Sequence, residues 1–315
     1  MTTERGSDAA GATGAVRTDP AQARGGSALA WLRALRPEQW LKNGFVLSPL
    51  VFSGKGTDLV AIEHAVAAFA AFCAVASAVY LVNDVVDRNA DRQHPRKRLR
   101  PIAAGLISPG LATGVAMALG AGGLLIAWYA SRGVVGVLAV YLVVNALYGL
   151  WLKQVVIIDV FVVASFFIMR LVAGSSAVGV RPSIWLLLCG GLLALYLGFA
   201  KRRHELMLLG ATSPSHRAVL AGYTTPFLDQ LSVVLLSVTV VSYVMYTLES
   251  ETARAVGSDV LSYSIVFVLY GVLRYLYLVQ RNEGGNPSET LLTDRSLLAA
   301  ATAWAAYCVY VIYIA

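Results

Sequence analysis

Residues 62–92 decide how the chain is organised, and they read IEHAVAAFAAFCAVASAVYLVNDVVDRNADR. The first part, 62–83, is an apolar run of about the 20 residues that an α-helix needs to cross a bilayer. The run ends in Asp84, Asp87 and Asp91, which are spaced i, i+3 and i+7. Residues at this spacing lie toward one face of an α-helix. The stretch therefore predicts a membrane helix that ends in an acidic face.

The rest of the chain has the composition of a polytopic membrane protein. Of its 315 residues, 57% are hydrophobic and 14% are charged, whereas soluble domains have roughly 45–50% and about 25%. Apolar runs predict nine membrane-spanning helices, at 39–54, 62–83, 107–130, 134–151, 155–175, 184–201, 230–248, 260–280 and 296–314. We therefore expect an all-α membrane protein with nine transmembrane helices. A soluble globular domain and a disordered chain are excluded.

The residues before the first span divide into two parts. Residues 1–27 are rich in Gly, Ala, Thr, Asp and Arg and lack the apolar core of a signal peptide, so we expect a disordered cytoplasmic tail. Residues 28–36 predict a short interfacial helix whose Arg36 can contact lipid phosphates. We expect residues 28–315 to form a single membrane-embedded catalytic domain.

The net charge of +7 indicates the orientation of the chain in the membrane. With the N-terminus inside, 20 of the 25 Lys and Arg residues lie on the cytoplasmic side and four lie outside, which agrees with the positive-inside rule. The remaining one, Arg170, lies inside the span 155–175, where we expect a structural pair or snorkelling. We expect a multi-pass plasma-membrane protein whose N-terminus and active site face the cytoplasm, with no nucleic-acid partner.

The acidic face after residue 83 predicts a metal site. Three carboxylates on one helix face repel one another unless a cation lies between them, and oxygen ligands suit Mg²⁺. A bound Mg²⁺ could neutralise the charge that develops on a diphosphate leaving group. The expected ligands are Asn83, Asp84, Asp87 and Asp91, and we expect the three aspartates to be catalytic. The alternative is a solvated helix end whose charge Arg88 and Arg92 compensate.

Basic and polar residues near the same membrane face predict phosphate binding. Residues 94–105 read HPRKRLRPIAAG, and arginine can clamp phosphate oxygens with a bidentate fork. The expected substrate-binding residues are Lys42, Asn43, Arg98, Arg100, Lys153, Asp159, Lys201, Arg202 and Glu205. Two alternatives stay open: the basic loop could contact anionic lipid, and Glu205 could simply pair with Lys201 or Arg202. A buried Asp159 needs a partner, such as Lys153 or a cationic cluster.

These motifs resemble the UbiA superfamily of membrane prenyltransferases. The resemblance rests on Asn83 to Asp91, on the His-Pro…Lys-Arg…Arg-Pro-Ile-Ala…Gly run that follows, and on nine helices. Most members carry a second Asp-rich motif after the sixth helix. This chain instead has Lys-Arg-Arg-His-Glu-Leu at 201–206, with no aspartate.

That departure is similar to one branch, the decaprenyl-phosphate phosphoribosyltransferases of cell-wall arabinan synthesis. Other stretches agree with this branch: RPEQWLKN at 36–43, LK at 152–153 with DVF at 159–161, RLVAG at 170–174, and PSE at 287–289 with DR at 294–295. The resemblance implies Mg²⁺-dependent transfer of 5-phosphoribose from phosphoribosyl diphosphate to a polyprenyl phosphate, with release of diphosphate. It also implies a homo-oligomer, with a trimer as one form.

Two other functions remain as alternatives. A prenyltransferase that uses isoprenyl diphosphate and an aromatic acceptor would, by family resemblance, need the second acidic motif that is absent here. A lipid or ion transporter tends to place ionisable residues near the bilayer midplane within internal repeats. In this chain the polar residues collect at one membrane face, which favours an enzyme.

Overall fold

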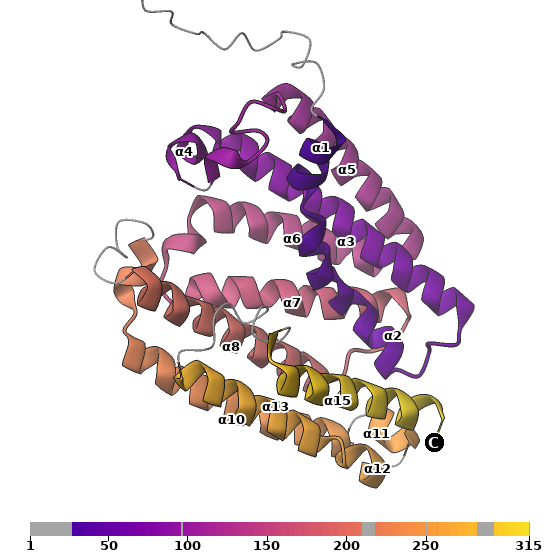
Figure 1. Cartoon of the computed structure of the whole chain (residues 1–315). Coiled ribbons are helices and arrows are strands. Elements are labelled where there is room, and N and C mark those ends of the chain that lie inside the picture. Colours follow the sequence, from indigo (N-terminus) through magenta and orange to yellow (C-terminus); the bar gives the residue numbers. More distant parts are fainter. Residues whose placement is uncertain are drawn as a thin grey trace, which may run out of the picture.

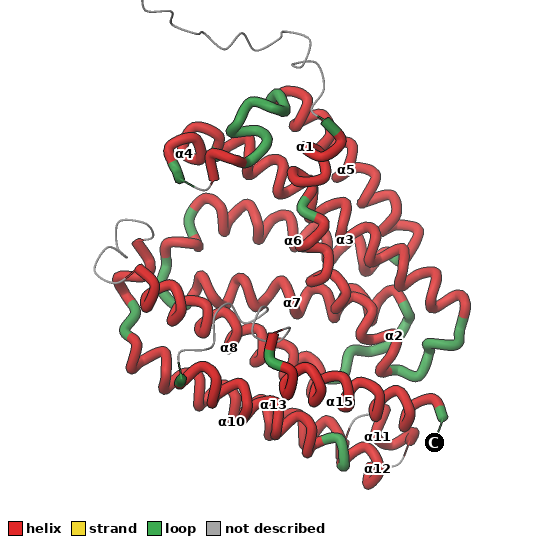
Figure 2. The backbone as a smooth tube through the Cα atoms, in the orientation of Figure 1, coloured by secondary structure: helices red, strands yellow, loops and turns green. Residues whose placement is uncertain are grey.

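The computed structural model describes residues 27–95, 97–209, 218–249, 251–256, 258–281 and 293–314. Within these ranges all regular structure is helical and no strand is present (Figure 2), as the sequence predicts. The expected disordered tail, except its last residue, lies outside the described residues.

Among the described residues, eight helices are long and apolar enough to cross a membrane, and they correspond to the last eight expected spans. Seven of them are α3 (Leu59–Val86), α5 (Pro109–Ala130), α6 (Arg132–Leu150), α7 (Ile158–Ala177), α8 (Ile184–Leu209), α10 (Thr225–Glu249) and α15 (Arg295–Tyr313). The other covers Val260–Val279 and includes most of α13 (Ile265–Gln280). In Figure 1, α7 lies in the middle, with α3, α5 and α6 on one side and α8, α10, α13 and α15 on the other.

The first expected span, 39–54, is not a regular α-helix. It forms a 3₁₀ helix, η2 (Pro37–Leu47), followed by the short helix α2 (Ser48–Phe52). Because a 3₁₀ helix rises about 2.0 Å per residue and an α-helix about 1.5 Å, these segments together reach about 30 Å, the thickness of the hydrocarbon core. Arg36 at one end contacts Asp84 of α3, and Lys55 at the other end donates to the carbonyl of Val178 after α7. The segment therefore runs from one end of the bundle to the other, beside the eight apolar helices that the described residues form.

A tight seam between η2 and α7 explains why this crossing can be irregular. Side chains three residues apart eclipse in a 3₁₀ helix, so Asn43 and Val46 both face α7. Asn43 Oδ1 accepts a hydrogen bond from Arg170 Nε at 2.9 Å. One turn along α7, Gly174 lies so close that a Cβ there would overlap the backbone carbonyl of Val46. The buried polar side chain of Asn43 in this crossing segment is thus satisfied by a partner in α7.

Arg170 is a structural residue in this seam. It is 6% exposed, its Nη1 donates to the carbonyl of Phe166 at 2.6 Å, and its guanidinium lies 5.5 Å from the ring of Phe72 and 5.6 Å from that of Tyr141. These contacts confirm the expected structural pair, and the side chain does not snorkel to the interface.

Contacts between elements distant in sequence define two ends of the bundle. At the end that holds Asp84, which we call the motif end, lie the short helices α1 (Ala28–Leu35), α4 (Arg88–Gln93), η3 (Lys97–Leu99), η4 (Leu152–Gln154) and η6 (Ala218–Gly222). At the opposite end, Ser131 bonds Ser176, and the Tyr313 hydroxyl accepts from the Gly56 N–H. The short helices α11 (Glu251–Val256) and α12 (Ser258–Ser262) lie there as well.

Candidate functional site

The acidic motif keeps a helical course beyond the end of α3. α3 ends at Val86, α4 begins at Arg88, and the N–H groups of Asp87 and Asp91 still bond the carbonyls four residues earlier, each at 2.8 Å. Asp84 and Asp91 are both 2% exposed and face the same way. Asp87 is exposed, because three residues at 100° each place it about 60° around the helix from Asp84. Two of the three predicted carboxylates therefore converge, and the third faces outward.

Two arginines hold the converging carboxylates. Arg100 Nη1 lies 3.1 Å from Asp84 Oδ1 and 2.7 Å from Asp91 Oδ2. Arg36 Nη2 lies 2.6 Å from the same oxygen of Asp84. The sequence predicted Arg100 at this site, but it assigned Arg36 to lipid phosphates. The motif therefore forms a compact cluster of two buried carboxylates and two guanidinium groups.

Arg36 reaches this cluster from a constrained backbone position between α1 and η2. Its φ of 54° is in the left-handed region, which costs a non-glycine residue about 1–2 kcal/mol, and the following Pro37 disfavours a helical conformation there. Its guanidinium lies 4.9 Å from the ring centre of Tyr80. Next to it, Trp40 Nε1 donates to the Ser77 hydroxyl, which donates to the Leu35 carbonyl, both at 3.0 Å. These contacts fix the junction so that Arg36 points at Asp84.

A second ionic cluster joins α7, α8 and the segment before α10. Asp159 is fully buried, and its two oxygens accept from Arg202 Nε and from the Tyr223 hydroxyl, each at 2.9 Å. Arg202 Nη1 also donates to Glu205 at 3.0 Å. The partner of Asp159 is thus Arg202 rather than Lys153, and Glu205 pairs with Arg202. These three residues, which the sequence placed in substrate binding, are engaged with one another in the structure.

Tyr223 is a residue of this cluster that the sequence did not single out. Its hydroxyl donates to Asp159 and accepts from the N–H of Ile157 at 2.6 Å. Burial raises the pKa of Tyr223 to about 12. The hydroxyl therefore keeps its proton, and its hydrogen bond to Asp159, at neutral pH.

The other predicted site residues occupy two different positions. Asn83, Arg98, Lys153 and Lys201 are exposed at the motif end, and Lys42 is exposed with its Nζ 2.8 Å from Gln39 Oε1. Asn43 is 1% exposed in the seam with α7, where its amide also donates to Cys73 Sγ at 3.2 Å. Because Cys73 precedes Asp84 by eleven residues of α3, Asn43 lies about 16 Å deeper than the acidic motif.

No ready-made metal site exists among the described residues. No three His, Cys, Asp or Glu side chains lie close enough together there to hold a metal ion. The reason is that Asp87 faces outward while Arg100 lies between Asp84 and Asp91. The donor set of the motif, one amide and three carboxylates, has the oxygen-only chemistry that Mg²⁺ prefers. The residues fit a divalent cation chemically once the arginines move.

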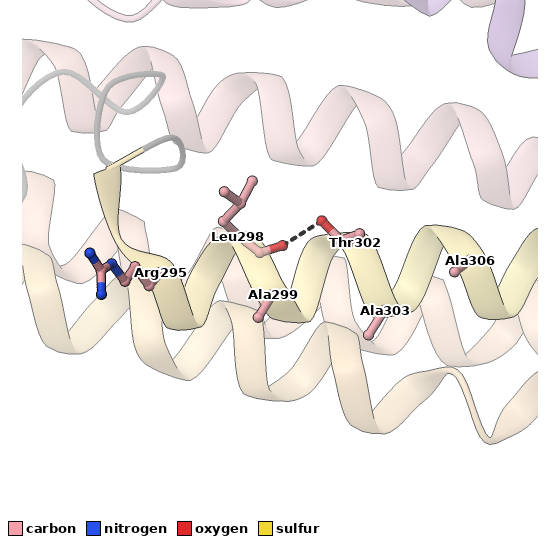
Figure 3. Close-up of a pocket in the computed structure, with 6 residues that line it drawn as sticks. All are labelled: Arg295, Leu298, Ala299, Thr302, Ala303 and Ala306. Atoms are coloured by element: carbon pink, nitrogen blue, oxygen red, sulfur yellow. Dashed lines mark hydrogen bonds between the residues drawn. The ribbon is translucent and has the colours of Figure 1, made fainter.

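A hollow elsewhere on the surface does not coincide with these clusters. It has a volume of about 540 Å³ and is lined by Arg295, Leu298, Ala299, Thr302, Ala303 and Ala306 (Figure 3). All six residues belong to α15, and the Thr302 hydroxyl is satisfied by the Leu298 carbonyl at 2.8 Å. This groove offers no set of reactive groups, so we place the functional site at the acidic motif.

The fold and the site define a class of multi-pass membrane protein in which ionic clusters collect at one end of a helical bundle. Residues 46–293 match the profile of the UbiA prenyltransferase family. The chain belongs to this family, which confirms the resemblance read from the sequence.

Two relatives that align with nearly the whole chain belong to one kind of enzyme within this family. The decaprenyl-phosphate phosphoribosyltransferase of Corynebacterium glutamicum is 35% identical over 288 residues, which cover 90% of this chain and 86% of that protein. The enzyme of the same name from Mycobacterium tuberculosis is 36% identical over 279 residues, which cover 87% and 91%. A solved UbiA homologue from Archaeoglobus fulgidus, bound to DMAPP and Mg²⁺, superimposes with a TM-score of 0.67 at 20% identity and covers 91% of this chain and 100% of its own. This superposition confirms the UbiA-like fold.

Proposed function

We propose that this protein transfers 5-phosphoribose from phosphoribosyl diphosphate to a polyprenyl phosphate and releases diphosphate. The observation that carries the proposal is the electrostatic difference between the two clusters at the motif end. Asp84 and Asp91 are held by partly exposed arginines, whereas the carboxylates near residues 201–206 are tied to a buried arginine. The similarity to two decaprenyl-phosphate phosphoribosyltransferases over most of the chain supports the same activity.

The acidic motif is the proposed binding site for the diphosphate of the donor. Asn83, Asp84, Asp87 and Asp91 would hold a Mg²⁺ ion there, as their oxygen-only chemistry fits. A Mg²⁺ ion bound there would supply neutralisation of the charge that develops on the leaving diphosphate. The Mg²⁺ in the solved homologue supports a divalent cation in this family.

The second cluster argues for a single metal-bound diphosphate. Arg202 is 6% exposed in its side chain and bonds both Asp159 and Glu205. Its buried guanidinium already occupies an oxygen of each carboxylate and has little room to move away, so these carboxylates are poor ligands for a second Mg²⁺. This arrangement suits a donor whose diphosphate binds at one metal site and whose separate phosphate binds to Lys and Arg side chains nearby.

The exposed cations at the motif end are the proposed partners of the remaining phosphates. Arg98, Lys153 and Lys201 at this end, and the exposed Lys42 on the segment that leads away from it, have the charge to bind the 5-phosphate of the ribose and the phosphate of the lipid. The lipid phosphate oxygen forms the new bond to C1 of the ribose as the bond from C1 to the diphosphate breaks. A phosphate monoester is mostly ionised near neutral pH, so no strong general base is required. Catalysis would then come from positioning and charge stabilisation.

We further propose that the motif end faces the cytoplasm. The excess of Lys and Arg on this side supports that orientation through the positive-inside rule. A cytoplasmic site would also meet a water-soluble sugar diphosphate directly, while the polyprenyl chain stays in the bilayer.

The decisive test is transfer of labelled phosphoribosyl diphosphate to polyprenyl phosphate in isolated membranes, with and without Mg²⁺. We expect Mg²⁺-dependent product that is lost in Asp84→Asn and in Asp87→Asn. Asp229→Asn is the matched control, because Asp229 pairs with Arg203 outside the acidic motif. Near-normal turnover in both motif variants, or transfer from an isoprenyl diphosphate to an aromatic acceptor instead, would overturn the proposal.

A further inference from the structure

One nitrogen of Arg100 lies where the two buried carboxylates of the acidic motif meet. Its Nη1 is within 3.1 Å of an oxygen of Asp84 and 2.7 Å of an oxygen of Asp91. A cation bridging the same two oxygens would have to take the place of this nitrogen. Arg36 Nη2 lies 2.6 Å from the same oxygen of Asp84.

The two kinds of group differ in their freedom to move. The side chains of Asp84 and Asp91 are each 3% exposed, whereas those of Arg36 and Arg100 are 23% and 29% exposed. A guanidinium group at a partly open position can turn toward solvent or a ligand, while a carboxylate buried in the helix packing cannot. Any exchange of partners must therefore be made by the arginines.

We propose that Arg36 and Arg100 are exchangeable counter-ions of the acidic motif. They neutralise Asp84 and Asp91 in the free protein, and they transfer to the diphosphate of the donor when a divalent cation takes the carboxylates. The identity of that donor rests on the function proposed above. The consequence is that the divalent cation and the diphosphate bind cooperatively.

The cooperativity follows from competition for the same oxygens. A divalent cation alone must displace Arg100, which then has no anionic partner. A diphosphate alone meets the carboxylates and finds the arginines already engaged. When both ligands bind, the cation replaces the arginines at the carboxylates and the diphosphate gives the arginines a new anion. By linkage, each ligand must then raise the affinity for the other by the same factor.

A purely structural role for Arg100 predicts a different result. In that case Arg100 would stay on Asp84 and Asp91 in every state and serve to attach residues 97–100 to the end of α3. Its substitution would lower thermal stability, but the coupling between the two ligands would not change. The coupling factor therefore separates the two roles.

The inference is tested by measuring Mn²⁺ binding to the purified full-length protein. Electron paramagnetic resonance reports the bound Mn²⁺, and inorganic diphosphate is the second ligand. Free Mn²⁺ is held at fixed values to correct for Mn²⁺ bound by diphosphate in solution. In the wild type we expect diphosphate to tighten Mn²⁺ binding by about tenfold or more, within the usual range of coupling between sites. In Arg100→Gln we expect tighter binding of Mn²⁺ alone and a coupling factor reduced to about threefold or less. Arg36→Gln should likewise tighten the binding of Mn²⁺ alone and reduce the coupling factor.

The matched control is Arg203→Gln, which removes an arginine from an ion pair with Asp229 at the same end of the bundle. This variant should match the wild type in Mn²⁺ affinity and coupling. Asp84→Asn measures the signal that does not come from the motif. If Arg100→Gln does not fold, Arg36→Gln and Arg100→Lys carry the test, because the lysine keeps the charge but loses the fork.

The inference is overturned if Arg100→Gln and Arg36→Gln bind Mn²⁺ no more tightly than the wild type, or if coupling is unchanged in both. Failure of the proposed function gives another pattern. Inorganic diphosphate contains no ribose, so coupling would persist even if phosphoribosyl diphosphate were not a substrate. Transfer of phosphoribose without any coupling would overturn this inference alone.

Discussion

Replacing Arg202 with methionine should destabilise the protein more than replacing its ion-pair partner Asp159 with asparagine. Arg202→Met leaves the fully buried Asp159 carboxylate with one hydrogen bond, from Tyr223. Asp159→Asn removes a charge but leaves Arg202 its bond to Glu205, whose side chain is 24% exposed. The two variants therefore break the same pair with different consequences.

The magnitudes follow from which group is left without a partner. An uncompensated charge buried by removal of its partner costs about 3–5 kcal/mol, which we assign to Arg202→Met. Asp159→Asn keeps an oxygen that can accept from Tyr223 and Arg202, so its cost is that of weakened hydrogen bonds, about 1–3 kcal/mol. In the double variant no buried charge remains on Asp159. Its cost should therefore fall below the sum of the single costs by about 2 kcal/mol.

The assay is reversible unfolding of the purified protein in mixed micelles, with transfer activity measured on the folded fraction. If Arg202 acts only on Asp159 and Glu205, the folded double variant should transfer phosphoribose at the wild-type rate per molecule. Loss of transfer in a stable double variant would show that Arg202 also contacts substrate, as its position in the sequence suggested. Additive costs, or a cost of Arg202→Met no greater than that of Asp159→Asn, would refute the reasoning.

Three further predictions concern other contacts at the motif end and in the seam. Gly174→Ala should destabilise the protein by about 1–3 kcal/mol, because its Cβ would meet the Val46 carbonyl, while Gly136→Ala, which opens onto free space, should be neutral or stabilising in the same unfolding assay. Tyr223→Phe should lower stability by a constant amount below pH 10, and the difference should shrink between pH 10 and about 12, because the hydroxyl ionises in the unfolded chain from about pH 10 while the folded protein keeps it protonated up to about pH 12; unfolding free energy measured against pH checks this. Asp294→Asn should be more stable than Asp294→Ala, because the amide can still cap α15 at the Leu297 N–H although both lose the ion pair with Arg274; thermal scans of equal stability would contradict this.

Most of what could be predicted from the sequence, namely the spans and the acidic face, came from long apolar runs and from helical spacing. The eight later spans could be read from the sequence, since a run of about 20 apolar residues has few other uses. The convergence of Asp84 and Asp91 followed from a spacing of seven residues, close to two helical turns. Asp87 was expected on the same face, and the structure turns it outward because three residues fall short of a full turn.

Tertiary partners could not be predicted from the sequence. Arg36 looked like a lipid-contacting residue because it follows a short amphipathic helix, whereas in the structure it bonds Asp84. Two local signals could have indicated this: the proline after it, which restricts its backbone, and the excess negative charge of a motif that needs a counter-ion. Arg202 and Asp159 are 43 residues apart, so only the packing of α7 on α8 reveals their pairing.

The 3₁₀ geometry of η2 suits the two sites that this segment connects, the acidic motif and the seam with α7. Along α3, Asp84 and Cys73 are eleven residues apart, or about 16 Å. In the first crossing segment, their partners Arg36 and Asn43 are only seven residues apart. Seven residues reach about 10 Å as an α-helix but about 14 Å as a 3₁₀ helix, so the 3₁₀ course leaves less of the distance for side chains to cover. The 3₁₀ course therefore lets the first crossing segment contact both the acidic motif and the seam with Arg170.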